Sequence, residues 1–326
     1  MSLARIFEEY PERRYIMYGG KGGLGKTTFS AATAYWLAKQ GYKVLVFSVD
    51  PQASLTDIFQ QDIFGKGPVE IIPGLFAQEI DADRRIKEYQ DEIRQKILDM
   101  YGLEEVPKEI DDYIQAAAAE PAMEESAIFD EVVDIVVGGE YDYYIYDLVP
   151  LGHALYYLSM ASVYDEWIEK ITKLREEMQE YAQVAALLQR QEEMEEDKIL
   201  AELQDIRYRI NTSSSILTDK EKTAFFFVIV PEEMAILDTQ RAAGLFAKFQ
   251  VPLSGYVVNR VLPKELAEQD IPEYLRHRLE MQRACLAKIE ELFGDQVLAY
   301  IPEFERDITG LEMIERMAEA MFGSAR

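Results

Sequence analysis

The sequence is poor in the residues that build thiol and imidazole sites. Its 326 residues include one cysteine, Cys285, and two histidines. A lone thiol excludes a disulfide within the chain, and it excludes any metal site that needs two cysteines from one subunit. A thiol can still be shared across a dimer. Because proteins without disulfides are typical of reducing compartments, we expect this protein in the cytoplasm.

Positive charge and long apolar runs are also scarce. The 34 lysines and arginines face 60 aspartates and glutamates, which gives a formal net charge of −26. Such a surface repels nucleic acid phosphates and anionic lipid headgroups, so nucleic acid is not an expected partner. No apolar stretch is long enough to cross a bilayer, and the sequence does not start as a secretion signal does. Direct membrane insertion is therefore not expected.

Short apolar runs alternate with helical stretches along the chain. Apolar residues make up 48% of the sequence, enough for the core of a large domain. The predicted strands are Tyr15–Tyr18, Val44–Val49, Tyr143–Leu148, Phe225–Val230, Gly255–Val258 and Val297–Ile301. Continuous β-branched and aromatic runs between helices are typical of a parallel sheet that is covered on both faces. The predicted fold is α/β, a doubly wound and mostly parallel sheet.

Two long stretches interrupt this alternation, at about 83–137 and about 159–215. In the second stretch, apolar residues recur every three or four positions among acidic ones, as in an amphipathic helix. Thr212–Ser215 reads as a flexible exit from it. No internal repeat is visible. We predict a single domain over residues 1–326, with a helical subdomain formed by insertions at about 83–137 and about 159–215.

The segment Gly20–Thr27, GKGGLGKT, has the pattern of a phosphate-binding P-loop. It follows a predicted strand and precedes a predicted helix, Thr27–Gln40, as this loop requires. Glycines let successive N–H groups turn towards phosphate oxygens, and the helix N-terminus adds positive potential. Lys26 is expected to reach the β- and γ-phosphates of ATP, and Thr27 to ligate Mg²⁺. The predicted nucleotide contacts in this region are Gly20, Gly22, Gly23, Gly25, Lys26, Thr27 and Thr28.

The loop holds a second lysine, Lys21, that the basic pattern does not require. Lys21–Thr27 is similar to the deviant Walker A motif, K-G-G-x-G-K-[ST], at every fixed position. That resemblance implies a homodimer in which Lys21 reaches the nucleotide of the second subunit. A cation from a partner would stabilise charge on the transferred phosphoryl group, so that hydrolysis depends on dimer geometry.

Two aspartates, Asp50 and Asp147, follow predicted strands. Ligands of open α/β sheets collect at the carboxyl ends of strands, although an aspartate there can also cap a turn. The resemblance implies that Asp50 orients or deprotonates the attacking water. It also implies a Mg²⁺ site of Thr27, Asp50 and Asp147, partly through water. His153 is assigned a switch or packing role, because phosphoryl transfer depends mainly on positioning.

Later segments resemble the ArsA and tail-anchored-protein-targeting (Get) branch of these ATPases. Asp147–His153, DLVPLGH, keeps the Asp, Pro, Gly and His of the branch's D-T-A-P-T-G-H. Pro231–Arg241 and the run ending at Asn259 are similar to the stretch that leads to an adenine-binding asparagine, which implies that role for Asn259. The closing segment is also similar and adds Pro302 to the implied nucleotide contacts. The implied fold is a SIMIBI-type P-loop NTPase.

Other positions depart from that branch. Eukaryotic targeting factors clasp zinc with a CxxC pair, and the matching positions here are Pro272 and Leu275, so no zinc is expected. Arsenite-stimulated members use cysteines in the helical region, where this chain has none. Asp50–Asp57, DPQASLTD, lacks the branch's histidine and is closer to the ParA/MinD partitioning ATPases.

Several functions stay open. The first is coupling of ATP-driven dimer closure to a hydrophobic helix client or membrane protein partner, with Leu174, Met178 and Tyr181 in a groove. Their helical spacing is more often typical of a core than of a groove. The second is a partitioning or positioning ATPase, which the net charge and the acidic terminal helix Leu311–Phe322 oppose. An anion-efflux pump energiser is opposed by the lack of thiols. A non-hydrolysing regulatory module is opposed by the complete set of catalytic residues.

Overall fold

An eight-stranded sheet organises the part of the chain that the computed structural model describes, which is residues 3–49, 54–101, 103–118, 121–147, 169–170, 173, 198–248 and 251–323. The strands are β1 (Tyr15–Gly19), β2 (Val44–Ser48), β3 (Val69–Ile72), β4 (Leu75–Glu79), β5 (Tyr143–Asp147), β6 (Thr223–Ile229), β7 (Leu253–Val261) and β8 (Val297–Pro302). Their spatial order is β3-β4-β2-β5-β1-β6-β7-β8, with β3 antiparallel to β4 and the other pairs parallel. The predicted α/β fold with a mostly parallel sheet is confirmed.

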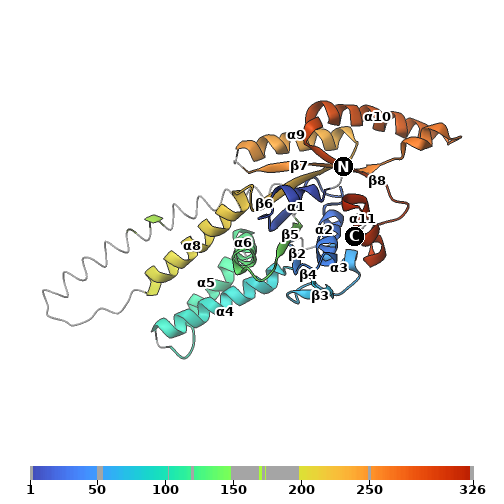
Figure 1. The fold of residues 1–326 in the computed structure, drawn as a ribbon. Coiled ribbons are helices and arrows are strands. Elements are labelled where there is room, and N and C mark those ends of the chain that lie inside the picture. Colours follow the sequence, from blue (N-terminus) through green and yellow to red (C-terminus); the bar gives the residue numbers. More distant parts are fainter. Residues whose placement is uncertain are drawn as a thin grey trace.

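Helices cover both faces of the sheet (Figure 1). One face packs against α1 (Arg5–Glu9), α2 (Lys26–Lys39), α3 (Ser54–Phe59) and α11 (Gly310–Phe322), and the other against α6 (Pro121–Gly138), α9 (Glu233–Lys248) and α10 (Glu273–Phe293). Neighbouring strand residues alternate between the two cores, as Ile16 and Met17 do. Because both faces are buried, the central strands are apolar throughout, which made them visible as uninterrupted runs.

The two ends of the described chain meet over α2. Leu3 N–H donates to the carbonyl oxygen of Met321 at 3.0 Å. The indole of Trp36, on α2, stacks on Phe322 with ring centroids 4.5 Å apart, and on Phe7 with centroids 5.6 Å apart. These aromatic contacts fix α1 and α11 on the same helix, since stacked rings add specific geometry to their buried area.

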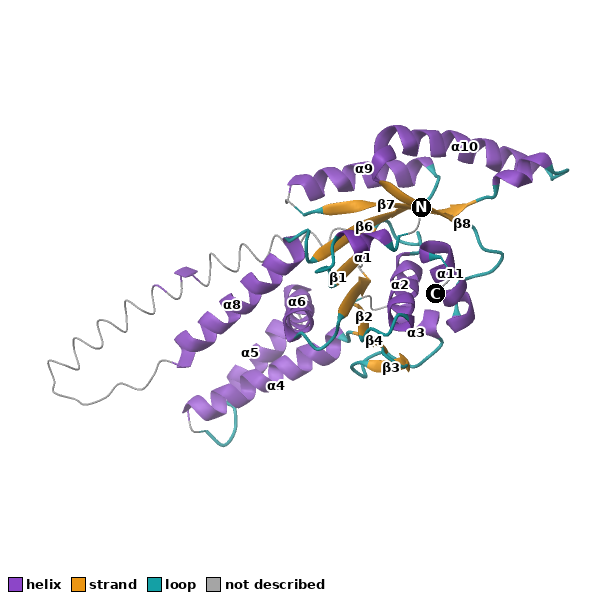
Figure 2. Ribbon diagram, viewed as in Figure 1, coloured by secondary structure: helices purple, strands orange, loops and turns teal. Residues whose placement is uncertain are grey.

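Four helices extend from one end of the sheet (Figure 2). They are α4 (Ala82–Tyr101), α5 (Lys108–Ala118), α6 and α8 (Lys198–Thr218), and α6 contacts each of the other three. The prediction of a flexible exit at Thr212–Ser215 is wrong, because this segment lies within α8. Ser213 is 3% exposed there, so packing outweighs the weak helix propensity of a serine run. No helix of the described ranges is both long and apolar enough to cross a membrane.

The hairpin of β3 and β4 was not predicted, because β3 is a short edge strand that is only partly buried and β4 ends in the polar pair Gln78 and Glu79. Its turn contains Gly74, whose φ is +86°, and an added Cβ there would lie 3.0 Å from the carbonyl oxygen of Tyr42. A residue without a side chain is therefore favoured at this turn. The hairpin places Glu79, the last residue of β4, opposite Ser48 of β2.

The carboxyl ends of the central strands form one edge of the sheet. Asp147 of β5 lies opposite Ser48 of β2 and opposite Tyr18 of β1. Strand β1 lies between β5 and β6, so the strands that follow it in sequence are divided between its two sides. Ligands of open α/β sheets bind at such a switch point, outside the carboxyl ends of the strands.

Candidate nucleotide site

The glycine-rich loop lies at this switch point, between β1 and α2. Gly20, Gly23 and Gly25 have φ values of +141°, +78° and +98°. An added Cβ would lie 2.7 Å from the carbonyl oxygen of Val228 at Gly20, and 2.7 Å from Nδ2 of Asn259 at Gly25. Side chains are therefore excluded at these two positions by both conformation and space. The loop has the close backbone packing that a phosphate cradle requires.

The two lysines of the loop lie in different environments. Lys26, at the start of α2, is 9% exposed, and its Nζ donates to the carbonyl oxygen of Lys21 at 3.3 Å. The side chain of Lys21 is 53% exposed, and its Nζ lies 3.1 Å from Oδ2 of Asp238 on α9. An ion pair that is exposed to this degree contributes about 0.2–1 kcal/mol. Lys21 can therefore exchange Asp238 for another anion at little cost. An added Cβ at Gly22, between the two lysines, would meet no atom within 4 Å.

Of the two predicted site aspartates, Asp50 and Asp147, the structure describes Asp147. It is 3% exposed, and its Oδ1 accepts a hydrogen bond from the Ser30 hydroxyl of α2 at 3.2 Å. Thr27 precedes Ser30 by one helical turn and shares its side of the helix. Hydroxyl and carboxylate oxygens are the ligands that Mg²⁺ prefers, so Thr27 and Asp147 fit this ion, which when bound would neutralise charge on the phosphates. Asp50 and His153 lie outside the described residues, and their roles stay predictions.

A buried carboxylate that was not predicted, Glu79, binds the start of α3, which follows Asp50 in the sequence. Its Oε1 accepts hydrogen bonds from the N–H groups of Leu55 and Thr56 at 2.6 and 3.3 Å, and its Oε2 accepts one from the Thr56 hydroxyl at 2.7 Å. Glu79 is 1% exposed. It therefore binds the first turn of α3, whose own N–H groups have no partner within the helix. Residues 50–53 connect the end of β2 to this fixed turn.

We expect Glu79→Ala to lower the free energy of unfolding by about 2–4 kcal/mol, because buried N–H donors that lose a charged acceptor cost about 1–3 kcal/mol each. Urea denaturation measures this change. ATP turnover should fall as well, since Leu55 and Thr56, a few residues after Asp50 in the sequence, lose their hydrogen-bond acceptor. Glu79→Gln, which keeps one acceptor oxygen, should lose less stability. Glu291→Ala, at an exposed carboxylate on α10, should stay within about 0.5 kcal/mol of the wild type. Equal stability of the Glu79 and Glu291 variants would contradict the anchoring role.

A cavity of about 510 Å³ opens beside the loop. It is lined by Gly25, Thr28, Asn259, Arg260, Pro302, Glu303, Phe304, Glu305, Arg306, Asp307, Ile308 and Met317. The cavity brings together four predicted nucleotide contacts from three distant parts of the sequence, which are Gly25, Thr28, Asn259 and Pro302. Asn259 is 8% exposed, and its Nδ2 donates to the carbonyl oxygen of Leu24 at 2.9 Å. A cleft of this size next to a phosphate loop suits a purine nucleoside.

No local sequence pattern marks Arg260 or the charged segment that follows Pro302. Arg260 lies near the end of β7, and the charged segment forms the loop between β8 and α11, so only the fold brings them to the cavity. Glu305 accepts a hydrogen bond from the guanidinium of Arg316 on α11, which holds the pKa of that carboxyl at about 2. The carboxylate of Glu305 is therefore ionised and paired with Arg316 at neutral pH.

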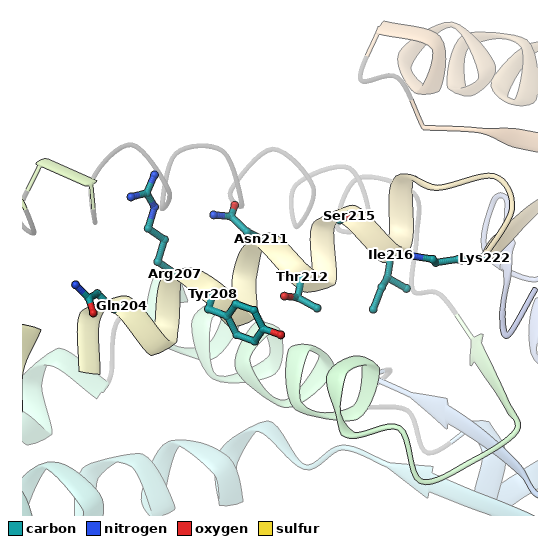
Figure 3. A pocket seen from close by; sticks show the side chains of 8 residues that line it. All are labelled: Gln204, Arg207, Tyr208, Asn211, Thr212, Ser215, Ile216 and Lys222. Carbon is teal, nitrogen blue, oxygen red and sulfur yellow. The ribbon is translucent and has the colours of Figure 1, made fainter. Parts of the chain in front are cut away.

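A second cavity, of about 550 Å³, lies along α8 (Figure 3). It is lined by Gln204, Arg207, Tyr208, Asn211, Thr212, Ser215, Ile216 and Lys222. The lining is mostly amide, hydroxyl and cationic, around the ring of Tyr208, which is 66% exposed. The predicted groove residues Leu174, Met178 and Tyr181 lie outside the described residues, so the predicted groove stays a prediction.

A glycine-rich loop that leads from the central parallel strand into a helix defines the class of the protein as a P-loop nucleoside triphosphatase. The sequence model of the family described as "Anion-transporting ATPase" matches residues 13–323. The chain therefore belongs to the ArsA ATPase family, and ATP hydrolysis is its activity. The predicted resemblance to the ArsA/Get branch is confirmed.

Named relatives cover almost the whole chain. The chain is 30% identical over 308 residues to "Putative arsenical pump-driving ATPase 2" of Aquifex aeolicus, covering 94% of this chain and 98% of that protein. It is 28% identical over 325 residues to "ATPase ASNA1 homolog 2" of Paramecium tetraurelia, covering 98% and 96%. It is 29% identical over 332 residues to "ATPase GET3C" of Arabidopsis thaliana, covering 95% and 83%. The similarity therefore extends well beyond the phosphate loop.

Proposed function

We propose that the protein hydrolyses MgATP as a homodimer and couples dimer closure to binding of a hydrophobic helix client or membrane protein partner. The observation that carries the dimer is the position of Lys21. This lysine belongs to the phosphate loop, but its amine is half exposed and held by a weak ion pair to Asp238. Lys26 already supplies a cation from within the loop, so Lys21 is available to a nucleotide on a facing subunit.

Each residue of the site has a role in this mechanism. The loop N–H groups and Lys26 hold the β- and γ-phosphates, while Thr27 and Asp147 hold Mg²⁺. Asp50 orients the attacking water, and Lys21 of the second subunit stabilises charge that develops on the phosphoryl oxygens. Little covalent chemistry is required of the protein, so the geometry of the two subunits sets the rate.

Base recognition follows from the hydrogen bond of Asn259. One N–H of its amide group is donated to the Leu24 carbonyl, which leaves the amide oxygen as an acceptor and the second N–H as a donor. The acceptor pairs with the 6-amino group of adenine and the donor with a neighbouring ring nitrogen, whereas guanine presents a 6-oxo group to the acceptor. We therefore assign the cavity to adenosine.

The client proposal rests on the family and on the GET3 and ASNA1 names of relatives. Its test is capture of a synthetic hydrophobic helix by the full chain, with ATP and with ADP. Replacement of Leu174, Met178 and Tyr181 by charged residues should abolish ATP-dependent capture and leave basal ATP turnover intact. Unchanged capture by these variants would eliminate the groove.

A partitioning role is opposed by the structure of α11. Its apolar side chains Met313, Ile314, Met317 and Met321 are buried against the domain, and Glu312, Glu315 and Glu319 outnumber Arg316. Such a helix offers neither the apolar face nor the positive charge that membrane surfaces bind. Retention on DNA at low salt that disappears at high salt would favour the partitioning role instead.

An anion-pump role is suggested by the names of the Aquifex relatives. In this chain it is opposed by the lone thiol, Cys285. ATP turnover measured with and without arsenite separates the two functions, and we expect no stimulation.

A further inference from the structure

Arg260 adopts a backbone conformation that is costly for a residue with a side chain. Its φ is +57°, in the left-handed region, and within the described part of the chain Gln60 is the other non-glycine residue with positive φ. Such strain persists where the surrounding structure imposes it, and it is concentrated at functional sites. Arg260 lines the 510 Å³ cavity, directly after Asn259.

Contacts on both sides impose this conformation. Before it, Asn259 is bound to the Leu24 carbonyl. After it, the Gln282 side chain, 7% exposed, accepts from the Leu262 N–H at 2.8 Å and donates to the Leu262 carbonyl at 3.1 Å. The pairing of β7 with β8 also shifts register between Val258 and Val261. The chain therefore turns sharply at Arg260, and the guanidinium is directed to the phosphate loop.

There the guanidinium of Arg260 donates to the carbonyl oxygen of Gly23 at 3.0 Å. Two consecutive side chains of β7 thus bind two consecutive carbonyl groups of the loop, those of Gly23 and Leu24. In a planar trans peptide the carbonyl oxygen and the following N–H point in opposite directions. Fixing these carbonyls towards β7 therefore directs the N–H groups of Leu24 and Gly25 away from it.

We propose that Arg260 is a positioning residue of the nucleotide site. It holds the Gly23–Leu24 peptide plane, as Asn259 holds the next one, so that the loop N–H groups are aimed at phosphate before the nucleotide arrives. The loop needs such support because glycines rotate freely. The inference rests on the proposed nucleotide site.

The test compares Arg260→Gly, Arg260→Ala and Arg260→Lys in the full chain, by calorimetric titration with MgATP and by thermal unfolding. Glycine accepts the left-handed conformation, so Arg260→Gly should unfold at the same or a higher temperature than the wild type. Its affinity for MgATP should nevertheless fall roughly 3- to 10-fold, because this hydrogen bond is exposed to solvent and contributes less than a buried one from a charged donor. Arg260→Ala should lose similar affinity, and Arg260→Lys, which keeps the charge and one donor group, should lose less.

Steady-state kinetics give the second measurement. The KM for ATP should rise in Arg260→Gly while kcat changes less than about threefold, because Arg260 touches none of the reacting atoms. Arg276→Ala removes an exposed positive charge from α10 and is the matched control, with binding as in the wild type.

Three results would overturn the inference. One is MgATP affinity of Arg260→Gly within twofold of the wild type while Lys26→Ala abolishes binding; the nucleotide site would then stand without this role. The second is a parallel fall of affinity and unfolding temperature in Arg260→Gly, which indicates a structural role alone. The third is a wild-type protein that does not bind MgATP, which would remove the nucleotide site together with the role of Arg260.

Discussion

Lys26→Ala is expected to lower the rate of ATP hydrolysis at least ~100-fold, the range found when a preorganised charge-stabilising donor is removed. Lys26 is the buried cation of the loop, 9% exposed, and its amine lies against the Lys21 carbonyl. Its replacement removes the group that neutralises the β- and γ-phosphates. Phosphate release from ATP measures the effect, and nucleotide affinity should fall in parallel.

The control for this prediction is Lys39→Ala, at the other end of the same helix. Lys39 is exposed, so the variant should keep wild-type turnover and stability within about 0.5 kcal/mol. The circular dichroism of Lys26→Ala should match that of the wild type. Turnover of Lys26→Ala within tenfold of the wild type would contradict the assignment of the loop.

Lys21→Ala is expected to lower turnover about 10²–10³-fold while changing the affinity for MgATP less than about threefold, because Lys21 acts on the transition state of the facing subunit. Asp238→Ala is the matched control. It breaks the same ion pair, Lys21 to Asp238, but keeps the amine. Turnover of Asp238→Ala should therefore equal or exceed that of the wild type.

Mixing the two inactive variants tests whether Lys21 acts between subunits. In a mixed dimer, the Lys21→Ala subunit keeps its own Lys26 and receives Lys21 from the Lys26→Ala subunit. One site of the two is then complete, so the mixture should recover a substantial part of wild-type activity. Activity that stays at the level of the separate variants would show that Lys21 does not act across a dimer.

Much of the fold could be predicted because the central strands are buried on both faces. Their uninterrupted apolar runs placed β1, β2, β5, β6, β7 and β8 within a few residues of their observed bounds. The edge hairpin of β3 and β4 has no such run, since β3 contacts the core on one side alone. The prediction for Thr212–Ser215 in α8 was wrong for a different reason. The weak helix propensity of serine predicted a flexible segment, but tertiary packing stabilises a helix there.

The residues of the nucleotide site also fall into two groups, those that a contiguous sequence motif indicates and those that only the fold brings together. The glycines and lysines of the loop are contiguous, and their spacing carries the chemistry, so the sequence alone indicated them. Glu79 acts through a hydrogen bond to Leu55, which is 24 positions away in the sequence. Arg260 acts through a hydrogen bond to Gly23, which is 237 positions away. No local pattern marks them, because their function depends on which strands lie side by side.

The aromatic stack over α2 gives the protein a built-in optical reporter. The helix that starts at Lys26 carries Trp36 three turns further on, and its indole contacts both Phe7 and Phe322, whose own ring centroids are 6.3 Å apart. A tilt or slide of this helix alters the contacts of the indole at both rings. Once the second tryptophan of the chain is replaced, as in Trp167→Phe, events at the phosphate loop can thus be followed through tryptophan emission without attaching a dye.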